Sequence, residues 1–101
     1  MESLAPGTTL IVQTRNSQYR LTVLNGERDA VLVEGGARFP KAVLARLQGA
    51  SAGGRLVKAG WIGVGLLMEL WVGAHRIITS PVRSVTIENI PPFSPRFGLT
   101  A

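Results

Sequence analysis

The stretch QYRLTVLNG, residues 18–26, decides the fold. Its apolar residues Tyr19, Leu21 and Val23 alternate with polar ones, and a period of two is typical of a half-buried β-strand. Asn25 and Gly26 follow, and both residues tolerate the positive φ angles of a tight β-hairpin turn. The stretch therefore predicts a strand that is followed by a reversal into a second, antiparallel strand.

Outward from this hairpin, short apolar runs separated by turn residues recur along the chain. We expect further strands at 9–14, 30–34, 56–57, 66–72, 76–79 and 83–88. Ser80-Pro81 should separate the last two, because proline has no N–H to donate to a ladder. Val85 and Ile87 should point inward. Six or seven short strands in about 100 residues predict an all-β fold, a small antiparallel barrel with at most one short helix.

Residues 39–48 are ambiguous, and the end of the chain differs in character. Pro40 could open a helix that Gly49 would end, whereas in a strand Val43, Ala45 and Leu47 would share one face. Consistency with the neighbouring segments favours the strand. Residues 1–89 are predicted to form a single barrel domain. Residues 90–101, which contain three prolines and two phenylalanines, are predicted to be an extended tail.

The composition argues against catalysis and against a membrane helix. The 101 residues include no cysteine and only one histidine, His75, and no ligand set for a metal clusters in the sequence. We therefore expect neither an enzyme nor a cofactor. The most apolar stretch, residues 59–74, contains Glu69 and is shorter than the roughly 20 residues that a spanning helix needs. We expect a cytoplasmic protein with no secretion signal and no membrane span.

A segment without acids carries the charge of the chain. Between residues 37 and 68 there is no Asp or Glu but five Lys or Arg, and the net charge of the whole chain is +5. Backbone N–H groups of glycine-rich loops and nearby cations together suit an anionic ligand, although a solvated charged face is the alternative interpretation. The candidate anion-binding residues are Arg15, Arg20, Ser51, Gly53, Gly54, Arg55 and Lys58.

Two of these loops resemble motifs of the PilZ family of small β-barrels. That family binds cyclic dinucleotides through Arg-x-x-x-Arg and a later Asp/Asn-x-Ser-x-x-Gly. Ser51 and Gly54 match the second motif, whereas Gly49 replaces its Asp or Asn and Arg15 and Arg20 are one residue too far apart. The resemblance implies a barrel with an anionic ligand. The chain is also similar to short uncharacterised bacterial β proteins, through patterns such as Gly60-Trp61-Ile62-Gly63-Val64-Gly65, and this implies no function.

Aromatic residues suggest a different role, in protein association. Trp71 has the opposite parity to Met68, Leu70 and Val72, so it should face outward. Phe93 and Phe97 add apolar groups to the proline-containing tail. These residues predict an interface, and the chain is interpreted as a non-enzymatic interaction module that self-associates into a homo-oligomer. The alternative is an anion-binding module that uses residues 37–68 for a cyclic dinucleotide or nucleic acid, although no specific nucleic-acid motif is present.

Overall fold

A computed structural model describes residues 4–25, 28–52 and 55–89 of the chain. These residues form seven strands and no helix, which confirms the predicted all-β fold. The strands are β1 (Thr9–Thr14), β2 (Gln18–Asn25), β3 (Ala30–Gly35), β4 (Phe39–Ala52), β5 (Arg55–Ala59), β6 (Leu67–Val72) and β7 (His75–Asn89). The predicted tail, with Phe93 and Phe97, lies outside the described residues, as do Gly53 and Gly54.

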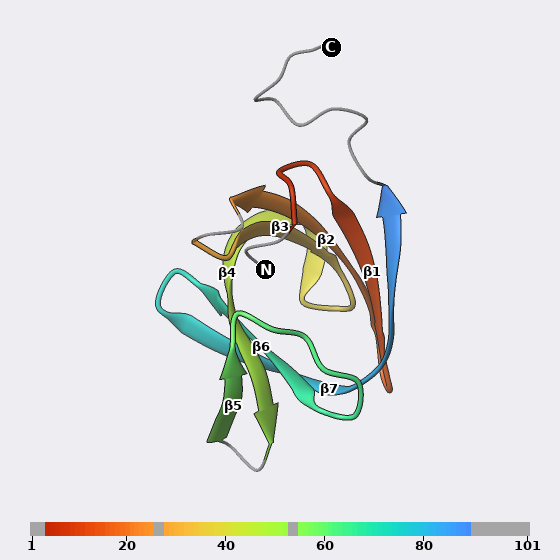
Figure 1. Ribbon diagram of the computed structural model, residues 1–101, viewed down its shortest axis with the longest axis vertical. Coiled ribbons are helices and arrows are strands. Elements are labelled where there is room, and N and C mark those ends of the chain that lie inside the picture. Colours follow the sequence, from red (N-terminus) through yellow and green to blue (C-terminus); the bar gives the residue numbers. More distant parts are fainter. Residues whose placement is uncertain (1–3, 26–27, 53–54, 90–101) are drawn as a thin grey trace.

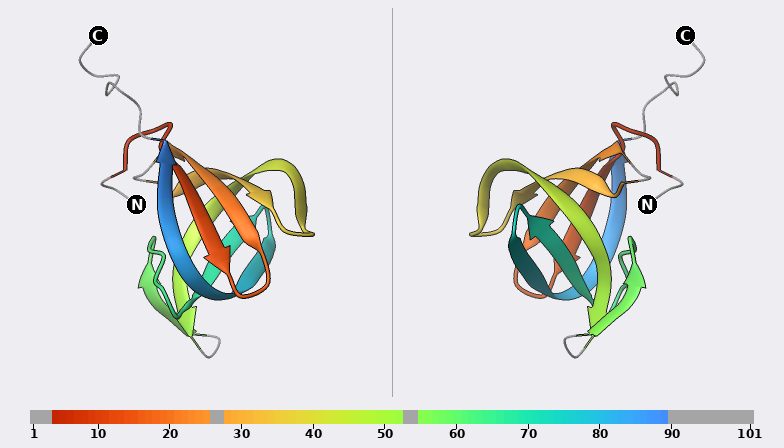
Figure 2. Two further views of the ribbon diagram at one scale, coloured as in Figure 1. Left: turned by 90° about the vertical axis from the view of Figure 1, so that its right-hand side faces the viewer. Right: turned by 90° about the vertical axis from the view of Figure 1, so that its left-hand side faces the viewer.

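The seven strands belong to one antiparallel sheet that closes on itself (Figure 1). Their order is β3-β2-β1-β7-β6-β4-β5, and an additional pairing of β3 with β4 completes a ring of six strands. Among the described residues, β5 pairs only with the second half of β4, so it extends the sheet beside the ring (Figure 2). Closure leaves few free strand edges, which is how small barrels avoid unwanted pairing.

Two long strands make the closure possible because each changes its neighbour partway along. The first half of β4 pairs with β3, and from Arg46 onward β4 pairs with β6. Residues 39–48 are therefore strand, as favoured above. β7 pairs with β6 as far as Pro81 and with β1 from Val82 onward. The predicted interruption at Ser80-Pro81 is wrong, because Pro81 sits where β7 exchanges partners and its carbonyl accepts the Arg15 N–H at 2.9 Å.

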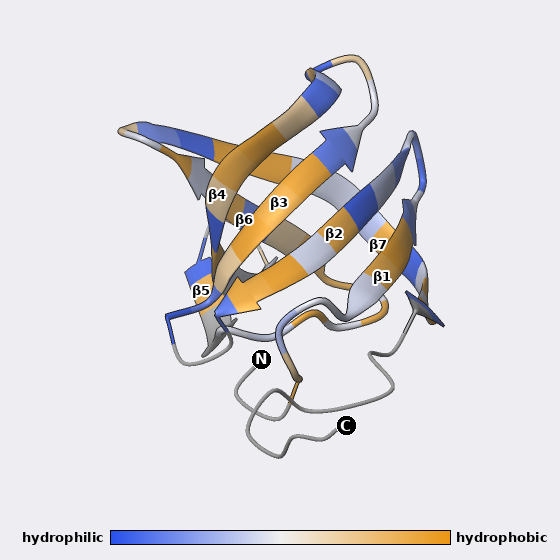
Figure 3. Ribbon diagram, turned by 90° about the horizontal axis from the view of Figure 1, so that it is seen from above, coloured by the Kyte–Doolittle hydropathy of each residue, from blue (hydrophilic) through white to orange (hydrophobic). Residues whose placement is uncertain are grey.

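The hydrophobic core lies inside the ring and is formed by the apolar side chains at alternate positions of the strands. In β2 the buried residues are Tyr19, Leu21 and Val23, as the alternation predicts. Figure 3 shows this alternation of apolar and polar residues along β2. The Tyr19 ring meets Phe39 edge-on, with ring centroids 6.2 Å apart and planes at 66°. Such edge-to-face pairs add stability beyond the area they bury.

Val85 and Ile87 depart from this pattern. They lie opposite Val12 and Leu10, which are buried, and opposed residues of paired strands share a face. Val85 and Ile87 therefore point to the inner face, as predicted, but they are 37% and 48% exposed, so this end of the inner face is not fully covered. The cause is the sheet topology: within the described chain, no strand pairs with the second edge of β7 beyond Val82.

Candidate functional site

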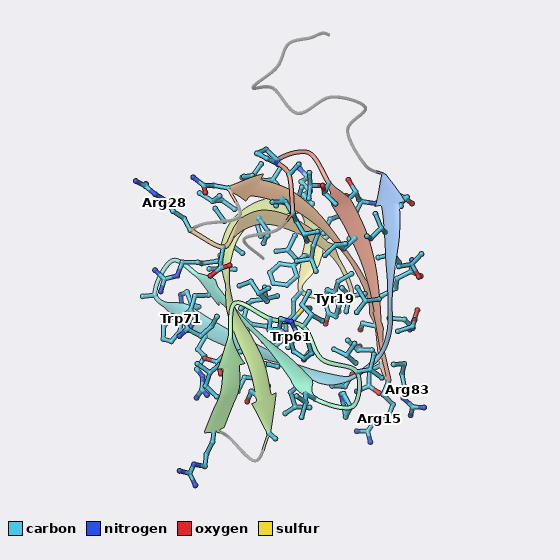
Figure 4. All side chains as sticks on the ribbon, in the orientation of Figure 1. Arg15, Tyr19, Arg28, Trp61, Trp71 and Arg83 are labelled. Carbon is cyan, nitrogen blue, oxygen red and sulfur yellow. The ribbon has the colours of Figure 1, made fainter. Side chains whose placement is uncertain are left out.

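An open groove of about 1020 Å³ crosses the outer face of the sheet where β4, β6 and the β2–β3 connection meet. We call it the Trp71 groove. The side chains that matter for its chemistry are Arg28, Asp29, Leu44, Arg46, Glu69 and Trp71. Figure 4 shows Trp71 and Arg28 on the same side of the molecule. The groove therefore combines an aromatic surface with charged groups of both signs.

Trp71 stands in a row of three side chains that runs across adjacent strands. In β4 the residue paired with Trp71 is Arg46, and in β7 it is Arg76. Opposed residues have Cβ atoms roughly 5 Å apart and share a face of the sheet. The turn at Gly73-Ala74 sets the second of these pairs, because it places residues 71 and 76 opposite each other. Trp71 is thus flanked by an arginine on both sides.

The buried side chain of Glu69 is hydrogen-bonded to two members of this row, Trp71 and Arg76. This side chain is only 5% exposed, and its carboxylate accepts a hydrogen bond from Arg76 Nη2 at 2.9 Å. The Trp71 indole Nε1 also donates to it, at 3.4 Å. The hydrogen bond from Arg76 and its positive charge lower the pKa of Glu69, an effect that burial opposes. Glu69 is therefore ionised at neutral pH and fixes the indole of Trp71 and the guanidinium of Arg76.

Of the charged side chains that line the groove, the two arginines are more accessible to a ligand than the two carboxylates. Glu69 is already paired with Arg76, and the Asp29 carboxylate lies against the backbone at Gly60, where an added Cβ would come within 2.8 Å of Oδ2. Arg28 and Arg46 are exposed, and neither forms an ion pair with a described residue. Within the described part of the chain, the Arg46 side chain donates one hydrogen bond, to Gln48 Oε1 at 3.5 Å. The groove is thus suited to anions.

The structure disperses the residues that the sequence suggested as an anion site. Arg15 lies in the β1–β2 turn, on the side of the molecule opposite to Trp71 (Figure 4). Arg20 is engaged with Glu88, at 3.1 Å. Ser51 is fully buried within β4, so it is not accessible to a ligand, and its hydroxyl has no hydrogen-bond partner among the described residues. Arg55 is exposed on β5.

The remaining predicted residues are divided between the groove and the part of the chain that is not described. Trp71 shares its face with Glu69, as its parity predicts. Gly53, Gly54, Phe93 and Phe97 lie outside the described residues, and so does the side chain of Lys58. The sequence reasoning did not select Arg28, Arg46 and Arg76 as site residues. The Gly73-Ala74 turn was a usable signal for Arg76, whereas Arg46 reaches Trp71 only through the pairing of β4 with β6.

Other kinds of site find little support in the described chain. His75 is exposed at the start of β7, and no three His, Cys, Asp or Glu residues of residues 4–25, 28–52 and 55–89 gather as metal ligands. Nor does any helix of sufficient length and apolar character to span a membrane occur in these ranges. No protein-family model, curated protein or solved structure matches this chain.

Proposed function

We propose that the protein is a non-catalytic module that binds single-stranded nucleic acid in the Trp71 groove. The observation that carries the proposal is the row Arg46–Trp71–Arg76 across three strands, with Arg28 at the rim. Single-strand binders combine an aromatic side chain on which a base stacks with cations that follow the phosphates. Here the half-buried indole of Trp71 supplies the stacking surface, and Arg28 and Arg46, which have no ion pair to a described residue, supply the cations.

The shape and the charge of the groove favour an extended ligand. Its volume of about 1020 Å³ is at the upper end for small-ligand sites, which usually enclose most of the ligand, but this groove is open. The chain has a net charge of +5, and this charge would attract a polyanion from a distance. Every base has a face for stacking, so the arrangement supports binding with little sequence preference.

A matched pair of arginine substitutions tests the proposal. Arg46 and Arg83 are both exposed, but Arg83 lies on the opposite side of the molecule from Trp71 (Figure 4). Arg46→Ser and Arg83→Ser remove the same charge, so both weaken a purely nonspecific attraction equally. Fluorescence anisotropy of a labelled single-stranded oligonucleotide of about ten nucleotides measures the affinity. We expect Arg46→Ser to weaken binding about tenfold and Arg83→Ser less than about twofold.

Three results would count against this function. Equal losses for the two variants would show that only the net charge matters and that the groove is not the site. Displacement of the oligonucleotide by a cyclic dinucleotide at much lower concentrations would instead support a ligand of the PilZ type. No measurable binding by the unsubstituted protein at low salt, where electrostatic attraction is strongest, would exclude the proposal altogether.

A further inference from the structure

The second half of β7 has a free edge, meaning one with which no described residue pairs beyond Val82. From Val82 onward β7 pairs with β1 along one edge only. On the other edge, the Val82 carbonyl accepts a hydrogen bond from the Gly65 N–H at 2.8 Å, and the Val82 N–H donates to the Leu66 carbonyl at 2.9 Å. Beyond Val82, no described residue pairs with this edge. Figure 2 shows β7 running along the border of the ring, beside β1. Unpaired backbone N–H and C=O groups on such an edge are a template for another strand.

The hydrogen bonds around β1 show which backbone groups of β7 point to this edge. Thr14 donates its N–H to the Ser17 carbonyl in the β1–β2 turn, whereas Arg15 donates its N–H in the other direction, to the Pro81 carbonyl of β7. Backbone directions alternate along a strand, so Ile11 faces β7, and its opposite residue Thr86 faces β1. Its neighbours Val85 and Ile87 therefore direct their N–H and C=O groups to the free edge.

We propose that a second copy of this chain pairs with this edge, β7 against β7, antiparallel about a two-fold axis at Thr86. In this register Val85 lies opposite the partner's Ile87, and Ile87 opposite the partner's Val85. These are the residues whose backbone groups point outward, so the two pairs can exchange their N–H and C=O bonds. A two-fold axis is the commonest symmetry of protein dimers and requires a self-complementary surface of this kind.

The side chains of β7 suit a copy of themselves. Val85 and Ile87 are 37% and 48% exposed, and the pairing covers these apolar side chains with each other. Glu88 is already paired with Arg20, at 3.1 Å. The edge of β5 is a poor alternative, because it carries Arg55 and Lys58 with no acid.

The expected dimer is weak, because the regular part of this edge, residues 84–87, is short and buries little surface compared with a permanent interface. Light scattering after size exclusion, from about 1 to about 500 μM protein, should follow the mass from 10.8 kDa toward twice this value. Ile87→Lys places a charge at the two-fold interface and should keep the mass at 10.8 kDa throughout. Leu24→Lys is the control, since Leu24 is also apolar and exposed but lies on β2.

Amide hydrogen exchange of the unsubstituted protein provides a second measurement that needs no variant. Exchange at Val85 and Ile87 should slow as the concentration rises, whereas exchange at Thr86, which faces β1, should not change. A monomer at every concentration would overturn the proposal, as would a dimer that survives in Ile87→Lys. A dimer lost only in a Phe93→Ser/Phe97→Ser variant would also overturn it, because the contact would then belong to the tail.

Discussion

Replacement of Trp71 by alanine removes the stacking surface of the groove and leaves its charges unchanged. Glu69 keeps its 2.9 Å ion pair with Arg76, so the carboxylate at the base of the row is still compensated. Alanine substitutions of stacking aromatics cost about 1–3 kcal/mol for each base. For one base, the dissociation constant of an oligonucleotide should therefore rise between about 5-fold and about 150-fold. Trp71→Phe, which retains a smaller ring, should fall between the alanine variant and the unsubstituted protein.

The salt dependence separates stacking from electrostatics in the same assay. For single strands, the slope of log K against log salt is about −0.7 for each phosphate neutralised. Trp71→Ala removes no cation, so its slope should equal that of the unsubstituted protein. Arg46→Ser should reduce the slope by about 0.7. An affinity of Trp71→Ala within twofold of the original, in a variant with an unchanged circular dichroism spectrum, would refute the stacking argument.

The other predictions concern the stability of the scaffold. Gly35 has φ +126°, and a Cβ there would clash with the backbone O of Gln18, whereas Gly65 at φ +88° has open space around it. In chemical denaturation, Gly35→Ala should lower the free energy of unfolding by more than about 3 kcal/mol and Gly65→Ala by only about 1 kcal/mol; equal losses would exclude the clash as the cause. The folded-state pKa of Glu69 lies below its ordinary value of 4.5, so its contribution to stability is complete above pH 4.5 and is lost as the pH falls through the lowered pKa. Glu69→Gln should flatten this part of the stability curve, and an unchanged acid dependence would show that Glu69 does not contribute to it.

Local patterns in the sequence predicted most of the fold. The alternation around Tyr19, Leu21 and Val23 identified a strand with a buried face, and the strands expected at 66–72 and 76–79 correspond to β6 and to the first part of β7. These patterns did not predict that the long strands β4 and β7 each pair with different strands in their first and second halves. Proline suggested a break at Pro81, but the strand continues because a different partner takes over there.

The site was harder to predict than the fold because it depends on pairing between distant strands. Arg46 meets Trp71 only because the second half of β4 lies beside β6. Ser51 matched a loop motif in the sequence, yet it lies in the long strand β4 with its side chain buried. The exposure of Val85 and Ile87 likewise depends on which neighbour is missing, and the alternation within β7 does not contain this information.

The most direct test of the central claim uses the two indole N–H signals that a chain with two tryptophans gives in a proton–nitrogen NMR spectrum. Trp71→Phe assigns them, since the signal that disappears belongs to Trp71. On titration with a single-stranded oligonucleotide, the Trp71 signal should shift progressively, and the Trp61 signal should stay in place because Trp61 does not line the groove. A shift of the Trp61 signal alone, or of neither signal while anisotropy shows binding, would contradict the claim that nucleic acid binds in the Trp71 groove.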